Sequence, residues 1–297
     1  MKVELEKAIE SFCVDEITDH QVYQYLSNIE GNESIRRILE KLASDEKRHY
    51  EFWKKLLGRE CKPRRIAGAL YRYIYRVLGP VFALNLLERG EEERIEEYRE
   101  FLKKLEGEAE RKELEAIIHD EVEHEHKLVE SIEDVRVKYM GYIALGLADA
   151  IVEVTGVHAG FLGATASTLA AGVAGLVVGF SAALSMAGAA YLQAKHSRGE
   201  ESPLFSALIT GVSYIFTVAL LAVPYFVYRD MVIAFTASLL VAILLTAFFT
   251  YYSTIVQKQR FLKELVTSVV LLLGTALGAY IFGDLIGRIT GVREVIG

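Results

Sequence analysis

Cysteine is nearly absent from this 297-residue chain, which carries only Cys13 and Cys61. No C-x-x-C pair occurs, so the sequence offers no ribbon for structural zinc and no rubredoxin-type iron centre. We expect no disulfide between the two cysteines, because disulfides are rare in the reducing cytosol. Any metal site therefore has to be built from other side chains.

An apolar core is missing from the first ten residues, MKVELEKAIE, so no secretory signal opens the chain and the amino-terminal part is expected in the cytosol. Charge is scarce in the second half: residues 137–297 carry 9 Lys and Arg and 8 Asp and Glu, whereas residues 1–136 carry 24 and 32. This contrast predicts a soluble acidic domain at 1–136 and a membrane domain at 137–297. No nucleic-acid partner is expected.

Five apolar stretches in the second part are long enough to cross a bilayer as helices, for which about 20 residues are needed. They cover 139–164, 168–193, 204–228, 231–253 and 262–287. With the amino terminus in the cytosol, five spans put the carboxyl terminus outside. The bias of positive loop residues supports this orientation; the inner loops hold Lys195, Arg198, Lys258, Arg260 and Lys263. We expect a multi-pass protein of the cell membrane, in contact with lipid.

The first part repeats itself with an offset of 75 residues, and each copy reads E-x6-Y-x22-E-x2-H. The matching residues are Glu16, Tyr23, Glu46 and His49, then Glu91, Tyr98, Glu121 and His124. Apolar residues recur every three or four positions, which indicates helices. We place them near 3–28, 32–57, 80–106 and 108–136, with a long crossover at 58–79. The predicted fold is all-α, a ferritin-like four-helix bundle followed by a five-helix transmembrane domain.

The repeat carries the chemistry of a metal site. Residues three apart on a helix share a face, so each Glu-x-x-His presents one carboxylate together with one imidazole. One Glu from each of two helices and a Glu-x-x-His from each of two others form the ligand set of carboxylate-bridged di-iron bundles. The predicted ligands are Glu16, Glu46, His49, Glu91, Glu121 and His124. Glu88 shares the face of Glu91 one turn earlier and is an alternative ligand on the third helix.

Three other features have two interpretations each. Tyr23 and Tyr98 either hydrogen-bond a ligand carboxylate or are plain core tyrosines. A second Glu-x-x-His, Glu123 with His126, is rotated by about 200° from the first and is expected at the surface, where it could collect metal. The basic and aromatic crossover at 58–79 is either an amphipathic helix at lipid headgroups or a segment packed along the bundle.

Residues 1–136 resemble the rubrerythrin branch of the ferritin-like superfamily in their paired Glu-x-x-His motifs. The resemblance implies oxygen-linked di-iron chemistry or iron binding. The rubredoxin-like module that feeds electrons to the iron centre of rubrerythrins is absent here.

Two acids interrupt the first apolar span. Asp149 and Glu153 lie one turn apart, and a charge at the centre of a spanning helix costs roughly 2.5–3.5 kcal/mol, so such acids mark an ion path by default. Met186 in the second span adds a thioether, which favours transition metals over Mg²⁺ and Ca²⁺. The alternative is a pair of acids satisfied by hydrogen bonds where helices pack. A row of small residues in the second span permits close helix contact: Gly175, Gly179, Ala183 and Ala187.

The stretches GLADAIVEVTG and SAALSMAGAAYLQAKHS resemble the vacuolar iron transporter family, over about 137–297. The resemblance implies a five-span homodimer that exchanges cytosolic Fe²⁺ or Mn²⁺ for protons. It also implies that Asp149 and Met186 are translocation residues at the dimer interface, with Glu153 nearby. Eukaryotic members carry a helical metal-binding insert between spans two and three, whereas this chain has only a short loop, so the bundle takes its place.

The whole arrangement resembles the membrane-bound ferritins of bacteria and archaea. The expected function is export of Fe²⁺ or Mn²⁺ by proton-coupled antiport, with a cytosolic di-iron domain that collects, senses or oxidises iron. The alternatives are a membrane-tethered ferroxidase or peroxide-scavenging di-iron oxidase, and a metal sensor that signals through the fourth helix.

Overall fold

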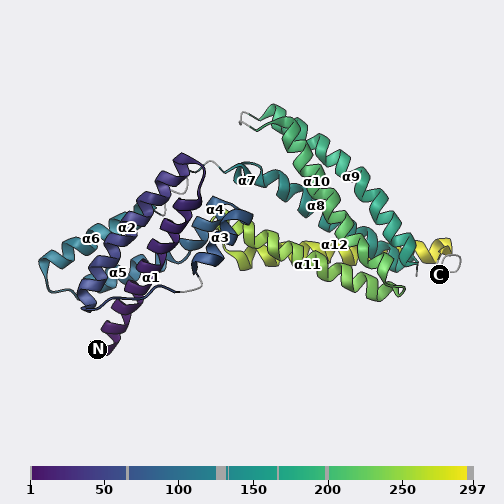
Figure 1. Ribbon diagram of the computed structural model, residues 1–297. Helices are drawn as coiled ribbons and strands as arrows, with labels where there is room; N and C mark the ends of the chain where they lie inside the picture. The colour runs from purple at the N-terminus through teal and green to yellow at the C-terminus, as the bar shows by residue number, and fades with distance from the viewer. Residues whose placement is uncertain are drawn as a thin grey trace. The chain divides into compact units, whose positions relative to one another are not determined.

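The computed structural model describes residues 2–64, 67–124, 132, 134–165, 167–197 and 201–292. Within these ranges every regular element is a helix, labelled α1 to α12 in chain order (Figure 1). The chain divides into two compact units, Met1–Asp134 and Val135–Gly297. The predicted all-α class is confirmed.

The first unit is built around four helical rods that share one apolar core. Its elements are α1 Lys2–Ile29, α2 Glu33–Leu57, α3 Ala67–Leu78, α4 Pro80–Leu87, α5 Glu91–Leu102 and α6 Glu108–Glu123. Asn32 caps α2 by accepting a hydrogen bond from the backbone N–H of Ser34, and Gly58 ends it in the left-handed conformation. The core contains Phe12 of α1 and Trp53 of α2, packed with side chains of α5 and α6.

The third rod is broken, which corrects the single helix predicted at 80–106. Helix α4 ends at Leu87, and α5 begins at Glu91 after Gly90, whose φ of +103° suits glycine. The break changes which glutamate of the third rod faces the core, relative to the position that the repeat predicts. As a result Glu88, the residue after α4, lies buried inside the bundle.

The fourth rod also differs from the prediction of 108–136. Helix α6 ends at Glu123 with His124 as its C-cap. Ile132 and Asp134 are not helical, and residues 125–131 and 133 lie outside the described residues. No Pro or Gly occurs between Glu123 and Met140, so nothing in the sequence marks this end.

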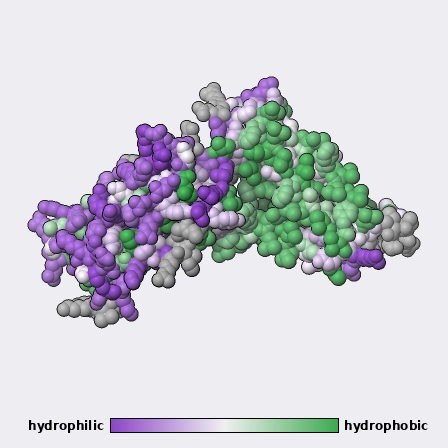
Figure 2. Space-filling model, viewed as in Figure 1, coloured by the Kyte–Doolittle hydropathy of each residue, from purple (hydrophilic) through white to green (hydrophobic). Residues whose placement is uncertain are grey.

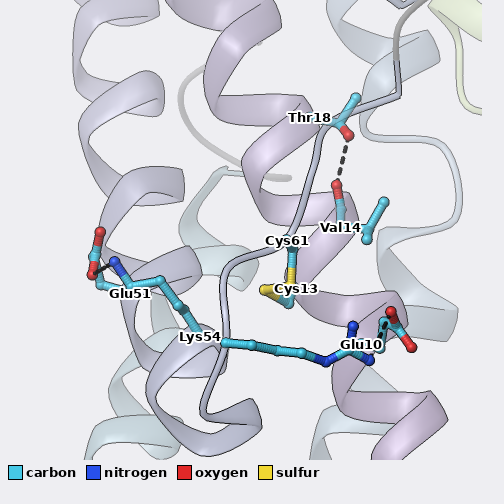
Figure 3. The surroundings of a disulfide bond; sticks show 8 residues. Glu10, Cys13, Val14, Thr18, Glu51, Lys54 and Cys61 are labelled. Atoms are coloured by element: carbon cyan, nitrogen blue, oxygen red, sulfur yellow. Dashed lines mark hydrogen bonds and ion pairs between the residues drawn. A yellow bond between two sulfur atoms is a disulfide. The ribbon is translucent and has the colours of Figure 1, made fainter.

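A disulfide joins Cys13 and Cys61, with 6.0 Å between their Cα atoms, which overturns the expectation of unpaired cysteines (Figure 3). The physical reason is the path of the chain after α2. Residues 59–64 run along α1: Arg59 pairs with Glu10 at 3.0 Å, and the backbone N–H of Arg64 donates to Thr18 at 3.1 Å. This path brings the two sulfurs together, and spacing in the sequence does not reveal it.

Helix α3 within the crossover packs along the bundle, which is one of the two predicted interpretations, and its contact with lipid headgroups stays a prediction. Its inner side packs on α1, where the Tyr75 hydroxyl donates to Glu30 and the Arg72 guanidinium lies over the Tyr25 ring. Two apolar side chains of its outer side, Leu70 and Val77, are half exposed.

The second unit contains five helices long and apolar enough to cross a membrane, which indicates a multi-pass membrane protein. In Figure 2 the surface of this unit is mostly apolar, whereas that of the first unit is mostly polar. Its elements are α7 Val135–Lys138, α8 Met140–Ala164, α9 Thr168–His196, α10 Pro203–Val227, α11 Met231–Val256 and α12 Phe261–Thr290.

Helix α8 is the centre of this unit and packs against α9, α10, α11 and α12. Its contact with α12 is made by backbone. A Cβ atom at Gly163 would lie 2.4 Å from the carbonyl oxygen of Tyr280, and one at Gly283 would lie 2.0 Å from that of Gly160. Only glycine permits such an approach.

The predicted small-residue row on α9 is used inside the chain. A Cβ at Gly179 would meet the Val218 side chain of α10 at 2.5 Å. Ala187 of α9 lies opposite Gly211, which also belongs to α10. A Cβ at Gly175 would meet His158 of α8 at 2.3 Å, so the row packs α9 on both α8 and α10.

Candidate metal centre

Buried carboxylates and imidazoles from α1, α2 and α6 converge in the middle of the bundle. Each helix has an apolar stripe that packs into the core, so the polar residues one turn along the same stripe have to face inward as well. The ligand atoms of four of them lie within 4.8 Å of one another. These four are Glu16, Glu46, His49 and Glu121, all less than 4% exposed.

The His49 ring has one nitrogen directed at the carboxylates. Its Nδ1 lies 2.8 Å from Glu121, 3.5 Å from Glu16 and 3.7 Å from Glu46. Carboxylates from three helices therefore surround one imidazole nitrogen.

His124 repeats this arrangement from α6. Its Nδ1 lies 3.5 Å from Glu46 and 3.8 Å from Glu121, so both of these carboxylates lie between the two imidazoles. The rings are nearly parallel, with centroids 6.1 Å apart. This is the pseudo-symmetry that the sequence repeat predicts.

The outer nitrogens of both rings contact aspartates that sequence reasoning missed. Nε2 of His124 lies 2.9 Å from Asp45 of α2, and Nε2 of His49 lies 3.5 Å from Asp120 of α6. Each aspartate immediately precedes the glutamate of its own helix. The repeat could have revealed these two aspartates, because Asp45 and Asp120 are related by the same 75-residue offset. Carboxylates in this position orient metal-binding imidazoles and raise their basicity.

The tyrosines of the repeat hold two carboxylates. The buried Tyr98 hydroxyl donates to Glu16, and the buried Tyr23 hydroxyl donates to Glu88. Glu88 therefore stands in the place that the repeat assigns to Glu91. The side chain of Glu91 lies outside the described residues. The three-residue difference follows from the break at Gly90.

The electrostatics of the cluster are those of closely spaced acids and bases. Burial opposes the charge of Glu121, but hydrogen bonds from His124 and His49 hold its pKa well below the usual range. Burial, followed by the charges of the neighbouring glutamates, raises the pKa of Glu46 well above the usual range. Burial also opposes the charge of His124, yet the surrounding carboxylates raise its pKa to about 12.

Several inward-facing atoms contact one another as ion pairs and have no further hydrogen-bond partner, which is costly for buried polar groups. They are Glu16 Oε2, Glu46 Oε2, Glu121 Oε1, His49 Nδ1 and His124 Nδ1. Carboxylate oxygens and neutral imidazole nitrogens are ligands for iron and manganese, so this donor set fits two cations. Glu46, Glu121 and the two imidazoles would hold them. Bound iron would supply one-electron oxidation and reduction.

A smaller group lies near the surface of α6. Ligand atoms of His119, Asp120 and Glu123 lie within 4.8 Å of one another, but Asp120 also pairs with Arg48, and Glu123 lies 4.0 Å from Lys41. His126, predicted to be close to Glu123 at the surface, lies outside the described residues.

The two acids of α8, Asp149 and Glu153, interact with a tyrosine of α10. The buried Tyr214 hydroxyl of α10 donates to Glu153 and also interacts with Asp149. Both acids are half buried. Met186 of α9 packs against the apolar cluster formed by Ala150 and Tyr214 with their neighbours. Sequence reasoning missed Tyr214 because nothing distinguishes it from other tyrosines of the spans.

A comparison with protein families gives a match over the half of the bundle that holds the first repeat. Residues 1–57 match the rubrerythrin family. The match covers α1 and α2, and so includes Glu16, Glu46 and His49 of the buried cluster. Comparisons with curated proteins and with solved structures found no match. The rubrerythrin-like domain and its Glu–His cluster indicate a site of the di-iron type.

Proposed function

We propose that this protein exports Fe²⁺ or Mn²⁺ across the cell membrane in exchange for protons, and that its rubrerythrin-like domain is a cytosolic di-iron unit that collects, senses or oxidises iron. In this proposal the carboxyl terminus is outside and the membrane domain is a homodimer. The resemblance of α8 and α9 to the vacuolar iron transporter family supports the cargo and the dimer.

The observation that carries the proposal is the Asp149–Glu153–Tyr214 cluster within helices apolar enough to span a bilayer. Acids are costly there, and an anchor needs neither the acids nor five helices. A carboxylate binds a cation only when ionised, so metal and protons compete for the same oxygen atoms. This competition couples metal movement in one direction to proton movement in the other. Met186 would add preference for a transition metal.

The role of the bundle follows from a donor set that fits a pair of iron ions. A buried pair of ions held by four carboxylates and two imidazoles can exchange electrons with oxidants while excess iron is exported. The opposing interpretation, a tethered oxidase, keeps this chemistry and gives the membrane helices no transport role. The hydrogen bond between Tyr214 and Glu153 is common to both interpretations, so flux has to decide between them.

The test is metal flux in liposomes that contain the full chain. Fe²⁺ or Mn²⁺ entry is followed with an enclosed metal-sensitive dye under an imposed pH gradient, for the parent and for Asp149→Asn. Asp284→Asn is the matched control, because Asp284 lies in α12 and pairs with Arg288 at 2.8 Å. We expect the control to transport and Asp149→Asn to lose flux. Flux in Asp149→Asn equal to that of the parent would contradict the proposal.

A further inference from the structure

Cys13 of the disulfide lies one helical turn before Glu16, a candidate ligand of the metal centre. Cys13 and Glu16 are both fully buried on α1 and three residues apart, which places them about 4.5 Å apart along the axis and about 60° apart around it. Cys13 belongs to the same core cluster as Tyr98, whose hydroxyl donates to Glu16. A sulfur atom and a candidate iron ligand therefore share one side of one helix.

The two sulfurs differ in access. Cys13 is 0% exposed, whereas Cys61 lies in the extended segment after α2 and is partly exposed. Thiol–disulfide exchange begins with attack on an accessible sulfur, and the other sulfur leaves as the thiolate. An external thiol can therefore reach Cys61, and the buried Cys13, on the side of the metal centre, would leave.

The contacts around Cys61 do not depend on the disulfide. The Arg59–Glu10 ion pair and the hydrogen bond from the Arg64 backbone N–H to Thr18 lie on either side of Cys61 along the chain. A further ion pair joins Arg64 to Asp15 at 2.6 Å. These contacts join the segment to α1 at points other than the disulfide and would hold the two thiols near each other after reduction.

We propose that Cys13 and Cys61 are a redox-active pair that returns electrons to the oxidised di-iron centre. This inference rests on the proposed iron centre in the bundle, and it assigns an electron supply for that centre to the two cysteines. A cytosolic disulfide is usually transient and either catalytic or redox-sensing, which agrees with the proposed location.

The proposed step transfers two electrons from the two thiols to the two iron ions. The two thiols lose two protons and two electrons as the Cys13–Cys61 bond forms, and the two electrons reduce two ferric ions to ferrous ions. A thiolate of an external dithiol then attacks the Cys61 sulfur and displaces Cys13. The second thiol of that dithiol attacks the mixed disulfide and releases Cys61, and the external dithiol leaves oxidised. The oxidant that makes the centre ferric is oxygen or hydrogen peroxide.

The experiment uses the full chain, purified in detergent and reduced with a dithiol. The reductant is then removed with oxygen excluded. The protein is loaded with two Fe²⁺ per chain and given one equivalent of hydrogen peroxide. Free thiols per chain are then counted by alkylation and mass spectrometry, and ferrous iron is measured with a colour-forming chelator. We expect the thiol count to fall from two to zero and two ferrous ions to be recovered.

Two controls separate the proposed step from direct oxidation and from a purely structural disulfide. Protein loaded with Zn²⁺, which has no redox chemistry, should keep both thiols when it receives the same peroxide. The Cys61→Ser variant should still bind iron and should leave it ferric. The fluorescence of Trp53, the only tryptophan, reports whether its side chain is still buried and so whether this variant is folded.

The possible failures are distinguishable. If iron does not bind to the bundle, this proposal falls together with the iron centre. If iron binds and becomes ferric while both thiols persist, only the redox role of the cysteines is overturned. Equal loss of thiols in the Zn²⁺-loaded protein would overturn it as well.

Discussion

The Asp45 carboxylate of α2 lies 2.9 Å from Nε2 of His124 on α6. The reverse contact, from Asp120 of α6 to His49 of α2, spans 3.5 Å. Each helix therefore supplies a glutamate to the centre and an aspartate that holds the imidazole of the other helix. The two Glu-x-x-His motifs cannot be positioned independently of one another.

Replacing Asp45 with Asn should weaken metal binding without removing a ligand. Loss of a carboxylate that orients a metal-binding imidazole typically lowers metal affinity 10–100-fold, and we expect about that decrease for Fe²⁺ or Mn²⁺. Competition with a chelator measures it. Glu115→Gln, on the exposed side of α6, is the control and should bind as the parent does. Parent-like affinity in Asp45→Asn would contradict the assignment.

Metal binding at pH 7 should release protons. In the metal-free protein the surrounding carboxylates, against the effect of burial, raise the pKa of His124 to about 12, so its imidazole is protonated at neutral pH. Coordination needs a neutral imidazole, so the metal displaces this proton and affinity rises with pH. Proton release is measured with a pH dye in weak buffer, and His124→Ala should release fewer protons. Binding without any pH change would show that His124 is not a ligand.

Glu88 should be the ligand contributed by the third rod. It is buried, accepts a hydrogen bond from Tyr23, and interacts electrostatically with Glu121 and His124 of the centre. Glu88→Gln should therefore lower metal affinity at least tenfold, by loss of a charged oxygen ligand, as measured by calorimetry. Glu96→Gln, on the exposed side of α5, is the matched control. If Glu91→Gln has the larger effect instead, the register read from the repeat is right.

Reduction of the disulfide should destabilise the bundle. The bond joins residues 48 positions apart, and a loop of this length corresponds to roughly 4 kcal/mol in the chain-entropy model. Trp53 is the sole tryptophan and packs in the core cluster that contains Cys13, so its fluorescence follows unfolding of this unit in the full chain. The denaturation midpoint should fall on reduction. The doubly substituted Cys13→Ser, Cys61→Ser protein should not respond to reductant.

Tyr214→Phe should slow metal flux about tenfold, because a hydrogen bond to a charged group contributes about 1.5–3 kcal/mol. It removes the donor to Glu153 and leaves the ring in place. Tyr225→Phe is the matched control on the same helix, since the Tyr225 ring packs on His158 instead of the acids. Equal flux in both variants would argue against a role of Tyr214 in the ion path.

Most of the fold follows from local patterns in the sequence. Apolar runs define the five spans, and the repeat brings Glu16, Glu46, His49 and Glu121 together. Glu88 could not be chosen over Glu91 by pattern alone, because the choice depends on how the chain turns at Gly90. The Cys13–Cys61 bond depends on the path of an irregular segment, which periodicity does not describe.

The glycine contact between α8 and α12 has a mechanical consequence. Where Gly163 and Gly283 bring two backbones together, no layer of side chains can rearrange to absorb a displacement. The two helices have to tilt as one stiff body. Asp149 and Glu153 belong to α8, so a tilt of α8 that displaced these acids would also displace α12 and the carboxyl-terminal end of the chain.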